Sequence, residues 1–140
     1  MAKTVLRLDD SDKFDFILIG IVCFHNDYRI CREINISLDI KMVRMNDFDV
    51  FNNKRMETQG FAFFQYLSKE FDEFCLVANK NPKGILIPEQ KQMDYFLMIR
   101  QGQHQYDSDE LVHQLKNTNT VLGAYKLDVT QLKSKENLVF

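Results

Sequence analysis

The residue types that most often hold metal ions are present in this sequence, but not at the spacing that a metal site needs. The three histidines, His25, His104 and His113, lie in separate segments. The sequence has no Cys-x2-Cys, His-x3-His or His-Glu-x2-His pattern, and such spacings place two ligands on one side of an ion. We therefore predict no metal site.

Covalent catalysis would need a serine, threonine or cysteine beside a base. Cys23 and His25 are two residues apart on a predicted strand, so their side chains share one face. Cys23, however, lies in the most apolar part of the chain, where burial would raise the pKa of its thiol. The glycine-rich loops that bind nucleotides are also absent from the sequence. We predict no catalytic residue and no cofactor, and we favour a non-enzymatic protein over an enzyme.

Two carboxylates flank a short polar segment between two predicted strands. Glu89 follows Pro88, which ends one strand, and Asp94 begins the next. Such a pair could do acid–base work, or it could fix the loop by accepting hydrogen bonds from backbone N–H groups. Acid–base work would need a base or cation as a partner, and none is apparent in the sequence beyond Lys91. We therefore favour the loop-fixing role.

The same segment resembles a known protein family. The string from Ile87 to Tyr95, with Met93 where the family has valine, is similar to the motif of the IPExxxVDY family of small Bacteroidota proteins. Length and layout are similar too, so the resemblance covers the whole chain. That family has no assigned activity, so the resemblance implies motif positions without roles. Those positions are Ile87, Pro88, Glu89, Asp94 and Tyr95.

An aromatic segment points to a different chemistry, the stacking of rings on RNA bases. Residues 59–66 match part of the signature strand of the RNA-recognition motif, in which alternating aromatic side chains contact bases. Gln59 stands where that signature has a cation, and a strand is predicted at 73–78 where the motif needs a helix. The chain also has 18 Lys+Arg against 20 Asp+Glu, too balanced for strong phosphate binding. We favour a core strand, and RNA binding through Phe61, Phe63 and Tyr66 is the alternative.

The elements that must position these residues follow from hydrophobic periodicity. The predicted strand 14–24 is apolar on both faces from residue 16 onward, which predicts a central strand covered on both sides. Asn26 or Asp27 can cap a helix in which Ile30, Ile34 and Leu38 form one apolar stripe. Most strand connections are too short for a crossover helix. We therefore predict an α+β fold, a mainly antiparallel β-sheet with two α-helices packed on one face. The predicted strands are 4–8, 14–24, 42–51, 60–67, 73–78, 85–87, 95–100 and 121–129, and the helices are 26–38 and one that begins after Asp107.

Composition limits the class and the compartment. The chain has 140 residues, 45% of them hydrophobic, and a formal net charge of −2, so we expect a single domain over residues 1–140. The longest apolar run, residues 16–24, is far shorter than the roughly 20 residues of a membrane helix. No secretory signal is recognisable, and the cysteines, Cys23, Cys31 and Cys75, are odd in number and lie in apolar stretches. We expect a cytoplasmic protein that does not associate with membranes.

The aromatic residues outside the strong strands suggest a partner surface. Most of the twelve phenylalanines fall in predicted strands and belong in the core. The outliers, which lie in weakly predicted segments, are Phe48, Phe51, Phe71 and Phe140. Exposed aromatic side chains mark protein interfaces, so we expect an adaptor that binds another protein, or a homodimer.

Overall fold

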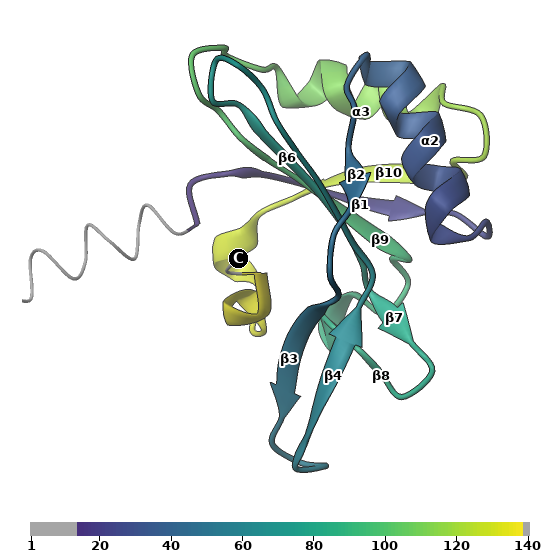
Figure 1. Cartoon of the computed structure of the whole chain (residues 1–140), viewed down its shortest axis with the longest axis vertical. Coiled ribbons are helices and arrows are strands. Elements are labelled where there is room, and N and C mark those ends of the chain that lie inside the picture. Colours follow the sequence, from purple (N-terminus) through teal and green to yellow (C-terminus); the bar gives the residue numbers. More distant parts are fainter. Residues whose placement is uncertain (1–13, 139–140) are drawn as a thin grey trace, which may run out of the picture.

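The centre of the molecule is a six-stranded antiparallel sheet with the strand order β10-β1-β9-β6-β5-β2 (Figure 1). The structure is a computed structural model and describes residues 14–138. The predicted strand 4–8 and Phe140 lie outside these residues. The strands of the sheet are β1 (Ile17–Val22), β2 (Val43–Arg44), β5 (Phe63–Leu67), β6 (Glu73–Ala78), β9 (Tyr95–Arg100) and β10 (Gly123–Leu127).

Two helices cover one face of this sheet, as the sequence predicts. Helix α2 (Asp27–Leu38) begins where the Asn26 side chain accepts a hydrogen bond from the backbone N–H of Arg29 at 2.9 Å. Helix α3 (Ser108–Lys116) begins at Asp107, which caps it in the same way. Their apolar sides pack on one core that includes the buried side chains of Ile30, Ile34, Leu111 and Leu115. The predicted fold class, α+β with a mainly antiparallel sheet, is confirmed.

A second core lies on the other face of the sheet. Strand β1 shows the division, because Ile19 and Ile21 are in the core under the helices, whereas Leu18 is in the second core. This double burial is why residues 17–22 are apolar on both strand faces. The C-terminal turns at 129–131 and 135–138 cover the second core together with a hairpin, and Leu138 is fully buried there.

Two predicted strands are each divided in the structure. The predicted strand 60–67 consists of β4 (Glu57–Phe61) and β5, which separate at Ala62. Strand β4 pairs with β3 (Phe48–Asn52) in a separate hairpin, whereas β5 pairs with β6. The predicted strand 42–51 is likewise divided between β2 and β3. The two halves of each predicted strand pair with different neighbours, and this pairing is not visible in hydrophobic periodicity.

The predicted strand 85–87 is shorter than expected. Strand β8 (Gly84–Ile85) pairs only with β7 (Lys80–Asn81), and a 3-10 turn follows at Pro88–Gln90. No helix among residues 14–138 is long and apolar enough to cross a membrane.

Candidate functional site

The motif segment 87–95 is held by the buried side-chain amide of Asn79, a residue outside the motif. The Asn79 side chain is fully buried, and its Nδ2 donates to the backbone carbonyls of Gln90 and Met93, each at 2.9 Å. Its Oδ1 accepts a hydrogen bond from the backbone N–H of Ile87 at 2.8 Å. One side chain therefore joins three points of the loop that carries the motif.

The two motif carboxylates engage different segments of the chain. Glu89 accepts hydrogen bonds from the backbone N–H of Ser134 at 2.6 Å and from its hydroxyl at 2.9 Å. Burial would raise the pKa of Glu89, but these hydrogen bonds outweigh it and lower the pKa. Asp94 accepts from the backbone N–H of Cys23 at 2.9 Å and pairs with Lys80 at 3.1 Å. Each carboxylate thus fixes the loop to a neighbouring element.

The remaining motif residues also hold the loop in place, through burial, turn formation or a hydrogen bond to the backbone. Ile87 is fully buried, and Pro88 begins the 3-10 turn, where its missing N–H costs nothing. The Tyr95 hydroxyl donates to the backbone carbonyl of His25 at 3.0 Å, and burial raises the pKa of this tyrosine. Met93 lies against Gly20, where an added Cβ atom would be 2.7 Å from its sulfur.

Cys23 and His25 line a shallow hollow of about 290 Å³ together with Asp94 and Tyr95. Cys23 is buried, and its sulfur accepts a hydrogen bond from the backbone N–H of His25 at 3.3 Å. No hydrogen bond joins the His25 ring to this sulfur in the part of the chain that the structure describes. The arrangement therefore lacks the nucleophile–base contact that covalent catalysis uses.

A second polar cluster surrounds the carboxylate of Asp72, which is fully buried. Its Oδ1 accepts from the backbone N–H groups of Gly102 at 2.7 Å and His104 at 3.3 Å. Its Oδ2 pairs with the His104 ring at Nδ1. The hydroxyls of Ser68 and Tyr106 also lie 3.3 Å from Oδ2. Asp72 thereby ties the loop after β9 to the turn between β5 and β6.

The electrostatics of this cluster follow from its hydrogen bonds. Burial would raise the pKa of Asp72, but the His104 ring and two backbone N–H groups outweigh it and lower the pKa to about 2. The hydrogen bond with Asp72 raises the pKa of His104 above 6.5. The ligand atoms of Glu70, Asp72 and His104 lie within 4.8 Å of one another, as in a metal site. Hydrogen-bond donors already occupy both oxygens of Asp72, so the cluster works as a clasp between two loops.

The aromatic residues considered for RNA stacking do not form an open platform. Phe61 and Phe63 are buried, 1% and 8% exposed, in the second core. Tyr66 packs on the core under the helices instead, with its ring 6.2 Å from that of Phe74. Phe61 and Phe63 therefore belong to the core, as the favoured interpretation expected, and Tyr66 packs on the other core. The three side chains do not share an exposed face on which RNA bases could stack.

The aromatic outliers do not form one surface either. Phe51 and Phe71 are exposed, but Figure 1 places the β3–β4 hairpin and the β5–β6 turn at opposite ends of the molecule. Phe48 is half-buried, with its ring 6.1 Å from that of Phe63. The expected partner surface therefore has to be sought elsewhere.

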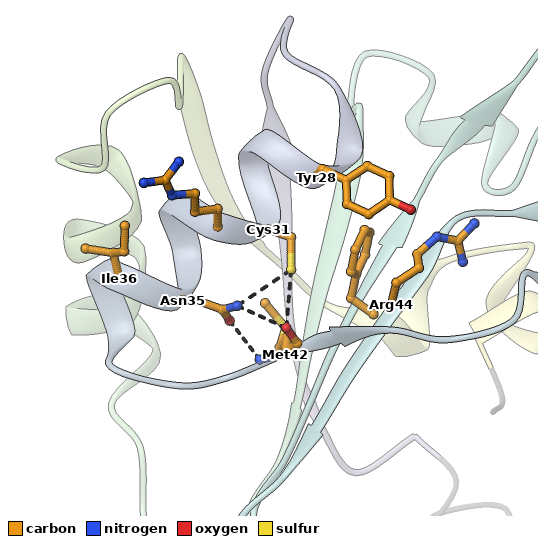
Figure 2. A pocket seen from close by; sticks show the side chains of 8 residues that line it. Tyr28, Cys31, Asn35, Ile36, Met42 and Arg44 are labelled. Carbon is orange, nitrogen blue, oxygen red and sulfur yellow. Dashed lines mark hydrogen bonds between the residues drawn. The ribbon is translucent and has the colours of Figure 1, made fainter.

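A cleft of about 300 Å³ lies between helix α2 and strand β2 (Figure 2). Its helix wall comes from α2 positions spaced by three and four residues, which share one face. Its floor is apolar and buried: Cys31, Met42 and Phe64. The other lining residues are Tyr28, Arg32, Asn35, Ile36 and Arg44.

Three side chains form one end of this cleft. The ring of Tyr28 meets the ring of Phe64 edge-on, with 5.8 Å between the centroids. The guanidinium of Arg44 lies 5.6 Å from the centroid of the same Phe64 ring. Figure 2 shows Tyr28 and Arg44 side by side above the strand. This end therefore presents an aromatic ring beside a cation.

The middle of the cleft is built by the Asn35 side chain. Its Nδ2 donates to the backbone carbonyl of Met42 at 3.0 Å, and its Oδ1 accepts from the backbone N–H of Met42 at 2.9 Å (Figure 2). Cys31 lies beside this pair, and burial raises the pKa of its thiol to about 11. At neutral pH Cys31 is therefore a neutral thiol.

This cleft was not predicted from the sequence. The stripe of Ile30, Ile34 and Leu38 that packs on the sheet was predicted, but the adjacent stripe of Tyr28, Arg32 and Ile36 was not. The spacing of four residues was visible, but the mixture of apolar and charged types resembles an ordinary solvent-exposed face. Strand β2 has only two residues, so its position at the sheet edge is set by tertiary pairing.

Comparisons of the chain with protein-family models, with curated proteins and with solved structures found no match. The resemblance to the IPExxxVDY family therefore stays a prediction.

Proposed function

We propose that this chain is a cytoplasmic, non-enzymatic adaptor that binds another protein through the cleft between α2 and β2. The observation that carries the proposal is the exposure of large apolar side chains around the cleft. Tyr28 and Ile36, which both line the cleft, are 64% and 66% exposed. Neighbouring apolar side chains that remain in water are typical of partner sites.

The chemistry of the cleft supports binding more than catalysis. Its one thiol, Cys31, is buried and neutral at physiological pH because burial raises its pKa to about 11. Its polar groups are an aromatic hydroxyl, an amide that is already hydrogen-bonded, and two guanidinium groups. The cleft therefore combines aromatic, methionine and arginine side chains, the residue types that are enriched in protein interfaces.

The proposal is tested by purifying the tagged chain from its own host, with and without nuclease, and identifying bound proteins by mass spectrometry. We expect a nuclease-resistant partner that is lost from the double variant Tyr28→Ser/Ile36→Ser. Both side chains are exposed, so the fold should tolerate the change. The matched control is Phe51→Ser/Leu122→Ser, which removes two exposed apolar side chains away from the cleft.

The control variant also defines the result that would refute the proposal. A partner that still binds the cleft variant but no longer binds the control variant would contact the chain elsewhere. A nuclease-sensitive set of proteins would favour the RNA-associated alternative instead.

A further inference from the structure

We propose that the partner presents an extended, acidic segment that lies in the α2/β2 cleft and pairs with the free edge of β2, an inference that rests on the proposed function.

The first support is the direction of the backbone groups at the sheet edge. Strand β2 is the last strand of the six-stranded sheet, and the N–H of Met45 donates to the carbonyl of Phe63 on β5 at 2.9 Å. In an antiparallel ladder, backbone groups point alternately to the two neighbouring positions. The N–H and C=O of Arg44, one residue earlier, therefore point away from β5. Among residues 14–138 no further strand pairs with this edge, so these groups are available to an added strand.

The second support is that Asn35 already imitates such a strand one step along the edge. Its carboxamide donates one hydrogen bond to the backbone of Met42 and accepts another, the two bonds that a paired residue would make. Met42 is thus closed to pairing, and Arg44 is the next outward-facing residue. The amide of Asn35 sets the point along β2 where an incoming backbone can begin to pair.

The third support is that the groove has a helix on one side and an edge strand on the other. Extended peptides that add a strand to a sheet bind in this geometry, with backbone bonds for affinity and pockets for alternate side chains. The buried floor of Met42 and Phe64 offers such a pocket between Tyr28 and Ile36.

The fourth support is charge. Two arginines and no acidic residue line the cleft, as far as residues 14–138 are concerned, although the whole chain has a net charge of −2. Arg44 already pairs with Asp47, whereas Arg32 has no ion pair with any residue that the structure describes. A carboxylate on the bound segment would therefore meet Arg32. Complementary charge at such a rim contributes to specificity and to association rate.

The test uses random dodecapeptides displayed on phage and selected on the immobilised full chain. We expect the selected peptides to alternate apolar residues with Asp or Glu. Their affinity, measured by fluorescence anisotropy, should fall about tenfold in Arg32→Glu. The matched control is Arg29→Glu on the same helix, because Arg29 faces Glu33 and does not line the cleft.

Backbone pairing is read out separately, by amide hydrogen exchange. A bound peptide should slow the exchange of the Arg44 N–H, and N-methylation of the pairing peptide residue should abolish this protection. An unchanged exchange rate, a selection of basic peptides, equal losses in both arginine variants, or no enrichment would each overturn the inference. The proposed function has a separate test. If one of these outcomes occurs but Tyr28→Ser/Ile36→Ser still loses the natural partner, the proposed function stands, and only the acidic, strand-like form of the partner segment is refuted.

Discussion

Asn79 occupies a position from which one side chain determines the path of a loop. Its amide makes three hydrogen bonds to the backbone of residues 87–93, and Asn79 is fully buried. The shape of the loop that carries the motif residues therefore depends on Asn79, which lies outside the motif. Buried backbone groups must be hydrogen-bonded, so this dependence is energetic as well as geometric.

Asn79→Ala should lower the free energy of unfolding by about 3 kcal/mol, because the Ile87 N–H and the Met93 carbonyl each lose a hydrogen bond in a buried position. The Gln90 carbonyl also loses its bond to Asn79 but keeps the one from the Met93 N–H. Urea denaturation measures the change. Asn53→Ala, an exposed position in the β3–β4 turn, should shift stability by less than about 0.5 kcal/mol. Equal effects of the two substitutions would show that the loop does not depend on Asn79.

The clasp between Asp72 and His104 should make stability depend on pH. The pKa of His104 is raised above 6.5 in the folded state, so its contribution is complete below pH 6.5 and is lost as the pH rises through the raised value. The pKa of Asp72 is lowered from 3.8 to about 2, so its contribution is present above pH 3.8 and is lost toward pH 2. Both contributions to stability are therefore complete between about pH 3.8 and pH 6.5.

We therefore expect His104→Gln to lower the melting temperature more at about pH 5.5 than at about pH 8.5. The matched control is His25→Gln, whose side chain is exposed and forms no hydrogen bond with a described residue. Thermal melts of both variants across this range measure the difference. A His104→Gln effect that does not vary with pH would mean that the charge on the ring is not used.

At the scale of single residues, the sequence predicts the kind of role that a side chain has better than it predicts the groups to which that side chain is bonded. Glu89 and Asp94 stood out because Pro88 and the strand signals bracket them, and a loop-fixing role follows from carboxylate chemistry. Asn79 and Asp72 could not be found in this way. Their partners are as far away as Gly102, and only the folded chain brings these segments together.

At the scale of elements, local signals were sufficient for the helices. Helix α2 has its cap at Asn26 and an apolar stripe with helical spacing, and both are properties of neighbouring residues. Strand boundaries depend instead on which strand pairs with which. The division at Ala62 arises because β4 pairs with β3, and β5 pairs with β6. The cleft depends on the same pairing, since it exists only where α2 overhangs the edge strand.

Asn35→Ala should detach α2 from this edge. We expect a loss of about 1 kcal/mol in the free energy of unfolding and faster amide exchange of Met42, because its N–H loses its partner. Urea denaturation and hydrogen exchange measure the two effects. Gln114→Ala, an exposed position on α3, should change neither. Unchanged exchange at Met42 in Asn35→Ala would contradict the proposed role of Asn35 as a strand mimic.

At the scale of the whole molecule, the sheet has two faces and each needs its own cover. The helices bury one face, and the C-terminal turns bury the other through Val129, Leu132 and Leu138 (Figure 1). Two hydrogen-bonded links hold these turns in place, from Ser134 to Glu89 and from the Asn137 side chain to the carbonyl of Leu86 at 2.9 Å. The motif loop is therefore also the attachment point of the C-terminal cover.

Leu138→Ala should consequently be among the most damaging changes, although Leu138 lies in an irregular segment near the chain end. Its side chain is fully buried in the second core, and truncation of a buried leucine costs about 3 kcal/mol. The matched control is Leu122→Ala, which truncates a side chain that is 61% exposed and should cost less than about 0.5 kcal/mol. Urea denaturation compares the two. If they cost the same, the second face of the sheet does not need the C-terminal turns, and the hydrogen bonds of Glu89 would serve only the local loop.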